Sequence, residues 1–235
     1  MQAELREYPS FPYDDFDDSL QQVKSIISRG VYYPDRIGHT YEEMVTFYEL
    51  AAGGYGRASG FTVQFGLSSG GSAVIIGMGL RECGKDYATP LVAIDPYLSV
   101  ETGYEIESQR VAKDNIQRLG LSDLVCPITF TAAEFVDTFW DKPVRLAVID
   151  TIHSYEQTKQ ETDCILPYMI RDSWLVVHGY HPASIGCVEA INELIDRLEI
   201  SEVFRVYNRA DLQADNEFCL IHESSLIMMR LNKET

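Results

Sequence analysis

Short apolar segments alternate with amphipathic ones along most of this chain, and this alternation restricts its fold more than any other feature. Each short segment is rich in β-branched or aromatic residues, which is typical of a buried strand. Strands are expected at 61–65, 91–94, 125–130, 144–149 and 174–177, and helices at 72–81, 105–119, 132–139, 155–170 and 186–200. This alternation predicts an α/β fold, with a parallel sheet covered by helices on both faces.

The two ends of the chain depart from the alternation. Segments 203–207 and 218–229 have strand character with no helix between them, so the sheet is expected to end in a hairpin. Segments 15–30 and 40–52 have helical periodicity. We therefore expect a helical extension or lid at 1–57 and an α/β domain at 58–235. The aromatic candidates to close over a pocket are Tyr32, Tyr33, His39 and Tyr41.

Charge and composition exclude several classes of partner. The net charge of -17 disfavours nucleic acids and anionic membrane surfaces, because binding either requires clustered Lys and Arg. No apolar run approaches the ~18 residues of a membrane span, and the polar N-terminus does not resemble a signal peptide. The five cysteines form no Cys-x-x-Cys pair. We therefore expect a cytoplasmic protein.

The segment "FGLSSGG" at 65–71 joins an expected strand to an expected helix. Its glycines permit a tight turn, and they also let a ligand approach the backbone at a helix N-terminus. The sequence alone leaves both explanations open. It matches neither a Walker A loop nor a clean Gly-x-Gly-x-x-Gly pattern.

Acidic residues and histidines follow the later strands. Asp95 ends the second strand, where an acid can accept hydrogen bonds from ribose hydroxyls. Thr131, after the third strand, is either near an adenine site or the cap of a helix with Glu134. Asp150 and His153 follow the fourth strand and are candidates for a metal ligand and a general base. After the fifth strand come two further imidazoles, those of His178 and His181.

Five segments in this order resemble class I S-adenosylmethionine-dependent methyltransferases. They are "VQFGLSSGGSA", "VAIDPY", "VIDTIHSYEQTKQETDCILPYM", "WLVVHGYHP" and "GCVEAINELI". The fourth-strand segment is most similar to a branch with a D-G-x-H-S-Y motif, which includes macrolide-sugar O-methyltransferases and cephalosporin-hydroxylase-like proteins. The resemblance implies a Rossmann-like, doubly wound sheet of seven strands with an antiparallel last strand.

The resemblance also implies a cofactor, S-adenosyl-L-methionine, and its binding residues. The first loop would receive the methionine part and Asp95 the ribose. Asp150 is a candidate for catalysis, cofactor binding and metal binding, and His153 is the expected general base. The full set of cofactor-binding candidates is Gln64, Gly66, Ser68, Gly70, Gly71, Ser72, Asp95 and Asp150.

The sequence departs from the family pattern at several positions. Gln64 replaces the acid that orients the loop and the ammonium end of the cofactor, and Ser68 replaces a glycine. In metal-dependent members, an acid after strand five joins Asp150 at a divalent cation. Here Gly179 stands in its place, so the remaining candidate ligands are the imidazoles of His178, which is preferred, and His181, and metal use stays open.

We expect methyl transfer to an oxygen or nitrogen of a small molecule, such as a natural product or a sugar. The alternative is a repurposed methyltransferase fold that binds cofactor or a partner without transfer, which the altered loop and Gly179 motivate. An NAD-dependent oxidoreductase would explain the glycine loop and Asp95, but not Asp150 and His153. The sequence does not settle the oligomeric state, for which a homodimer is the common default.

Overall fold

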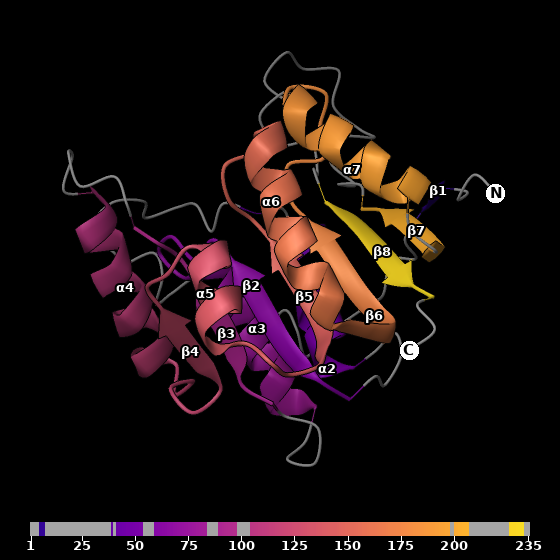
Figure 1. The fold of residues 1–235 in the computed structure, drawn as a ribbon. Helices are drawn as coiled ribbons and strands as arrows, with labels where there is room; N and C mark the ends of the chain where they lie inside the picture. Colours follow the sequence, from indigo (N-terminus) through magenta and orange to yellow (C-terminus); the bar gives the residue numbers. More distant parts are fainter. Residues whose placement is uncertain are drawn as a thin grey trace, which may run out of the picture.

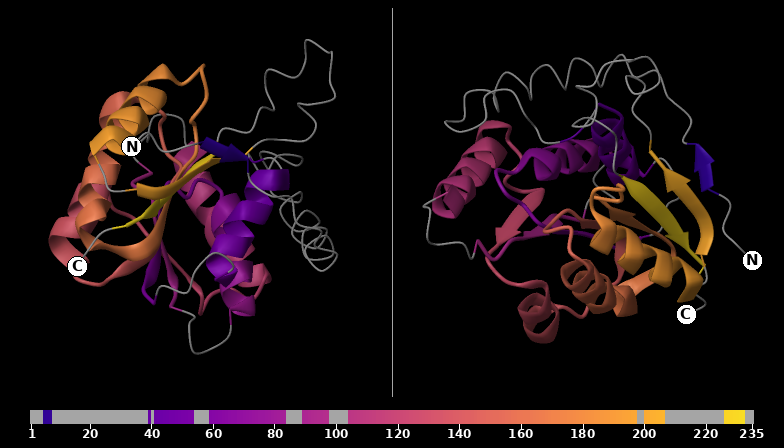
Figure 2. Two further views of the ribbon diagram at one scale, coloured as in Figure 1. Left: turned by 90° about the vertical axis from the view of Figure 1, so that its right-hand side faces the viewer. Right: turned by 90° about the horizontal axis from the view of Figure 1, so that it is seen from above.

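The computed structural model describes residues 5–7, 39, 41–53, 59–83, 89–97, 104–197, 200–206 and 226–232. Among these residues, one mixed sheet lies between two layers of helices (Figure 1, Figure 2). The helix expected at 15–30 and two lid candidates, Tyr32 and Tyr33, lie outside the described residues. The division of the chain at residue 57 therefore stays a prediction.

Most elements form where the sequence pattern places them. The helices are α2 (Tyr41–Ala52), α3 (Gly71–Glu82), α4 (Tyr104–Arg118), α5 (Ala132–Phe139), α6 (Tyr155–Ile165), the 3₁₀ turn η1 (Leu166–Tyr168) and α7 (Ile185–Arg197). The strands are β1 (Leu5–Glu7), β2 (Phe61–Phe65), β3 (Leu91–Ile94), β4 (Val125–Ile128), β5 (Val144–Ile149), β6 (Met169–Val177), β7 (Ile200–Arg205) and β8 (Ile227–Leu231).

The sheet has the order β1-β7-β8-β6-β5-β2-β3-β4. Strands β2 to β6 pair in parallel, and β8 is antiparallel to both of its neighbours, β6 and β7. The expected Rossmann-like, mostly parallel sheet with its antiparallel last strand is thus confirmed. One more strand, β1, pairs in parallel with β7, so the sheet has eight strands and not seven.

The boundary between α6 and β6 differs from the prediction. A helix was expected to reach Ile170 and the strand to start at Trp174, but α6 ends at Ile165 and β6 begins at Met169. Pro167 lies in the 3₁₀ turn between them, where its ring and missing N–H do not allow an α-helix to continue. The polar residues 171–173 hid the strand because they interrupt its apolar pattern.

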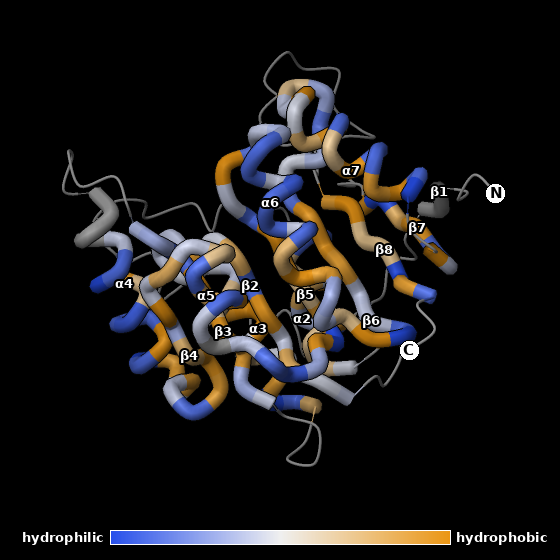
Figure 3. The backbone as a smooth tube through the Cα atoms, in the orientation of Figure 1, coloured by the Kyte–Doolittle hydropathy of each residue, from blue (hydrophilic) through white to orange (hydrophobic). Residues whose placement is uncertain are grey.

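The sheet separates two apolar cores. One contains buried residues of α2, α3 and α4, and the other those of α5, α6 and α7. Successive strand residues alternate between them: Trp174 and Val176 belong to the first core, Leu175 and Val177 to the second. Figure 3 shows the apolar strands between more polar helices. None of the described helices combines the length and apolarity that crossing a membrane requires.

Helix α2 runs antiparallel to β5, and a buried arginine fixes its C-terminal end. The guanidinium of Arg145, near the start of β5, donates hydrogen bonds to the carbonyls of Leu50 and Ala51. These carbonyls belong to the last turn of α2, which lacks partners within the helix. A cation at this end is also favoured by the helix dipole. The other end of α2 consequently lies at the far end of β5.

Candidate functional site

Four neighbouring strands end on one row at the carboxyl edge of the sheet. Their last residues pair across it: Ile94 with Phe65, Phe65 with Ile149, and Ile149 with Val177. The residues that follow these strands therefore lie side by side, and they are Asp95, Gly66, Asp150 and His178. The order of the strands changes direction between β2 and β5. Ligands bind at such a point in doubly wound sheets.

Gly66 is required by the packing of two strand ends. Its φ is 86°, a left-handed conformation that favours glycine. A Cβ at this position would overlap the backbone carbonyl of Asp150, at the end of β5. The backbone geometry where the two strands end therefore accounts for this glycine. Of the two explanations that the sequence left open, a tight turn and the approach of a ligand, the first is sufficient at Gly66.

The rest of the first loop is shaped by Asp95. One oxygen of its carboxylate accepts the N–H groups of Leu67 and Ser68, both at 2.9 Å, and the other accepts that of Tyr97 at 2.9 Å. Gly70, with a φ of 87°, is the N-cap of α3 and provides no side-chain cap. The loop thus presents a helix N-terminus whose positive end favours anionic groups.

Gln64 is buried beneath this loop. Its amide nitrogen donates hydrogen bonds to the carbonyl of Gly66 at 2.6 Å and to the hydroxyl of Ser72 at 2.7 Å. Its oxygen Oε1 is buried and has no hydrogen-bond partner among the described residues. A buried acceptor without a donor is costly, so this atom favours a ligand that donates a hydrogen bond.

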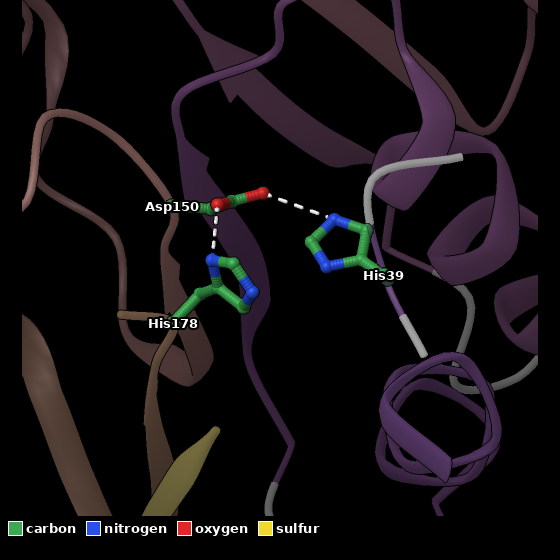
Figure 4. A group of neighbouring side chains, drawn as sticks. All are labelled: His39, Asp150 and His178. Atoms are coloured by element: carbon green, nitrogen blue, oxygen red, sulfur yellow. Dashed lines mark ion pairs between the residues drawn. The ribbon is translucent and has the colours of Figure 1, made fainter. Parts of the chain in front are cut away.

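Two imidazoles lie between two carboxylates on the other side of the edge, and Figure 4 shows these imidazoles, those of His39 and His178, beside the carboxylate of Asp150. His39 Nε2 lies 3.2 Å from Asp150 Oδ2, and His178 Nδ1 lies 3.1 Å from Asp150 Oδ1. The opposite nitrogens, His39 Nδ1 and His178 Nε2, each lie 3.7 Å from Oε2 of Glu43. Acids and imidazoles therefore alternate in a closed ring of four side chains, in the order Asp150, His39, Glu43 and His178.

The charges in this ring support one another. Burial by itself raises the pKa of Asp150, but His39 and His178 outweigh this effect and hold it well below its ordinary value. Burial likewise lowers the pKa of His39, while the carboxylates of Asp150 and Glu43 raise it well above 6.5. At neutral pH, Asp150 is ionised and His39 carries a proton.

His153 stands beside the ring as a neutral imidazole. Its ring centroid lies 5.3 Å from that of His178. Burial, together with the proximity of His178, lowers its pKa below 6.5 in spite of Asp150. Gly179 has a φ of 88°, and a Cβ there would overlap the imidazole of His153. His153 therefore fills the space that the side chain of an acid at position 179 would need.

The predicted site residues Asp150, His153 and His178 are thus brought together, but His39 and Glu43 were not predicted as members of the site. His39 was expected only as an aromatic lid residue, and Glu43 lies in the first turn of α2. A clue was that His39 and Glu43 are four residues apart at the expected start of a helix, a spacing at which two side chains can meet. The sequence did not show that the start of α2 lies next to the carboxyl end of β5.

Several other polar residues near the strand ends have structural partners. His181 accepts the backbone N–H of Ala183 and is not part of the ring. The hydroxyls of Tyr155 and Tyr180 are bonded to Glu193 and Asn192 of α7. Thr131 and Glu134 form a capping box at the start of α5, which confirms the structural one of their two proposed roles.

Residues 63–180, about half of the chain, match a family model described as a methyltransferase domain. The chain belongs to this methyltransferase family. The match begins in β2 and extends just past β6, so it includes Gln64, Asp95, Asp150 and His178. It does not include α2, and His39 and Glu43 therefore lie outside the matched region. A search of curated proteins finds no match.

Several solved structures, O-methyltransferases among them, resemble this chain over most of its length. Cofactor-bound Rv0187 from MTB is 15% identical with a TM-score of 0.66, covering 96% of this chain and 100% of that chain. The O-methyltransferase TomG from Streptomyces achromogenes is 14% identical (TM-score 0.65, 94% and 96% covered). An O-methyltransferase from Bacillus cereus is 13% identical (TM-score 0.61, 94% and 92% covered). At these identities, the likeness shows the fold.

Proposed function

We propose that this protein transfers a methyl group from S-adenosylmethionine to a hydroxyl oxygen of a small molecule. The observation that carries the proposal is the row formed by Asp95, Gly66, Asp150 and His178 at the switch point of a methyltransferase-family sheet. TomG and the Bacillus cereus enzyme, whose structures contain SAM and SAH, support the choice of cofactor and of oxygen as the acceptor.

The first loop fits the amino-acid end of this cofactor. The orphaned Oε1 of Gln64 is an acceptor for an ammonium group, and the uncapped N-terminus of α3 suits a carboxylate. Asp95 already accepts three backbone N–H groups, yet a carboxylate has about four lone-pair sites, so a ribose hydroxyl can still donate to it. The bound cofactor would supply an electrophilic methyl group.

His153 is the proposed general base. Because its pKa is lowered, its imidazole is unprotonated at neutral pH and can accept the proton of the acceptor hydroxyl. Asp150 contacts His39 and His178, so it is not expected to orient His153 directly. Gly179 leaves room for the imidazole of His153, because any side chain at position 179 would displace that imidazole.

The loops next to His153 favour an acceptor with an apolar part. Ile152 is 75% exposed and precedes α6, and Ile185 is 64% exposed and is the first residue of α7. The two loops meet, since a Cβ at Gly186 would lie 2.6 Å from the backbone nitrogen of Tyr155. TomG acts in tomaymycin synthesis, which supports a natural product as the acceptor class.

The first test is calorimetric titration of the folded protein with S-adenosylhomocysteine. Micromolar binding is expected. Asp95→Asn should weaken it at least about tenfold, since the loss of a charged hydrogen bond costs about 1.5–3 kcal/mol. Asp123→Asn, an exposed change on the surface, is the matched control. No binding by folded protein would refute the cofactor assignment.

The second test separates transfer from binding alone. Acceptors with an apolar body and a free hydroxyl are screened for the release of S-adenosylhomocysteine. His153→Gln should abolish the release while leaving S-adenosylhomocysteine binding unchanged. Cofactor binding without release by any acceptor would favour the repurposed fold instead.

A further inference from the structure

We propose that His39, Asp150 and His178 bind a divalent transition-metal ion, and that Glu43 holds both imidazoles in position for it. This site lies next to the proposed cofactor loop, but it does not depend on methyl transfer. The metal site would be present even if this protein binds its cofactor without transferring a methyl group.

The spacing of the donor atoms suits one ion. Asp150 lies 3.2 Å from the nearest nitrogen of His39 and 3.1 Å from that of His178, and one donor atom from each of the three residues lies within 4.8 Å of the others. Two ligands of one ion are about 3.0–3.5 Å apart when metal–ligand distances are about 2.1 Å and the angle between them is between a right angle and a tetrahedral one. To bind the ion, donor atoms spaced more widely than this, up to 4.8 Å apart, have to move closer, and His39 has to release the proton on its coordinating nitrogen.

The donors come from three separate elements that the fold fixes independently. Asp150 follows β5 and His178 follows β6, and their positions are set by the register of these strands. His39 precedes α2, which is held at its other end by the hydrogen bonds of Arg145. The side chains of His39, Asp150 and His178 are only 4%, 18% and 15% exposed. Such a shielded set can hold an ion in place.

Glu43 places a carboxylate on the far side of both imidazoles, where a metal-binding histidine usually has its partner. Such histidines donate their second ring N–H to a carboxylate or carbonyl, which fixes the tautomer and the ring orientation. Here the far nitrogens of His39 and His178 both face Oε2 of Glu43 at 3.7 Å, and the Glu43 side chain is 2% exposed. One buried carboxylate thus lies within ion-pair distance of both imidazoles and can accept their N–H groups if the rings turn slightly toward it.

The donor set selects the kind of ion. Two imidazole nitrogens and one carboxylate suit ions such as Zn²⁺, Fe²⁺, Co²⁺ or Ni²⁺, whereas Mg²⁺ prefers a shell of oxygens. At position 179, where the family resemblance implies an acid, this chain has a glycine. The side chain of an acid there would overlap His153. The remaining positions around the ion stay open for water or for an oxygen of a ligand.

The test measures metal binding directly, in protein freed of affinity tags and stripped with EDTA. Calorimetry with CoCl₂, ZnCl₂ and MgCl₂ should give one Co²⁺ or Zn²⁺ ion per chain at micromolar affinity or tighter, with Mg²⁺ at least about a hundredfold weaker. Bound Co²⁺ should also produce visible absorption bands typical of nitrogen and oxygen ligands. If Mg²⁺ binds as tightly as Co²⁺, or if neither Co²⁺ nor Zn²⁺ binds, the proposal is wrong.

Variants locate the site. His39→Gln and His178→Gln should each lower Co²⁺ affinity at least about a hundredfold, and Glu43→Gln about 10–100-fold. His181→Gln, which changes an imidazole outside the ring, should leave the affinity unchanged. Circular dichroism checks that each variant is folded. Should His39→Gln fail to fold, His178→Gln and the Co²⁺ spectrum of Glu43→Gln decide. Equal Co²⁺ affinity in His178→Gln and the unaltered protein would overturn the assignment.

Discussion

Glu161 should make the stability of the protein depend on pH. This residue of α6 is 2% exposed, and its carboxylate accepts hydrogen bonds from Thr151 and Gln157, both at 2.6 Å. Burial raises its pKa from 4.5 to about 7, although the two hydrogen bonds oppose the rise. The folded state therefore binds more protons than the unfolded state between these two values. The free energy of unfolding must fall as the pH rises through this window.

The size of the effect follows from the pKa values. At about 1.4 kcal/mol for each pH unit, the rise from 4.5 to about 7 corresponds to about 3 kcal/mol. About 2 kcal/mol of this falls between about pH 5.5 and about pH 8. Glu161→Gln removes the charge, and the amide of Gln157 can turn over to keep a hydrogen bond with it. The variant should thus lose less stability over this range than the unaltered protein.

Urea unfolding at several pH values measures the difference. The unfolding free energy of Glu161→Gln minus that of the unaltered protein should increase by about 2 kcal/mol from about pH 5.5 to about pH 8. Glu156→Gln, an exposed change on the same helix, is the control and should give a flat difference. A flat difference for Glu161→Gln would refute the argument that burial raises the pKa of this carboxyl in the folded protein.

Three further changes probe the fold around the site. Gly66→Ala should lower the unfolding free energy in urea by more than about 2 kcal/mol, because a left-handed backbone costs about 1–2 kcal/mol and the added methyl overlaps the Asp150 carbonyl; an unchanged midpoint would contradict this. Gly179→Ala should shift the imidazole NMR signals of His153 by pushing the ring aside, and unchanged signals would show that the ring is placed otherwise. Arg145→Lys should cost about 1–2 kcal/mol and speed amide exchange in the last turn of α2, whereas unchanged exchange would mean that the cap is not needed.

The strands that carry the site could be predicted because their signal is local. Apart from Arg145, the run 144–149 is apolar on both faces, as is typical of a strand between two helix layers, and its six residues are all buried. The residues after such strands are then natural site candidates, which is how Asp95, Asp150 and His178 were found. The signal failed where the strand was polar: residues 171–173 concealed the first half of β6.

The role of Gly66 could not be decided from the sequence, since a glycine needed for strand packing and one needed for a ligand read alike. The structure separates the two by what a Cβ would meet, here the carbonyl of Asp150. The absence of an acid at Gly179 was visible in the sequence. That His153 occupies the freed space was not, because the two residues belong to different loops.

The sequence by itself determined the α/β alternation, the antiparallel end of the sheet and the loops that hold the chemistry, because each is written in a local pattern of apolar residues and turns. Only the tertiary structure decided which loops are neighbours. The strand order places Asp150 beside His178, and Arg145 anchors α2 so that His39 and Glu43 reach them. These contacts join residues far apart in the chain, where no local periodicity connects them.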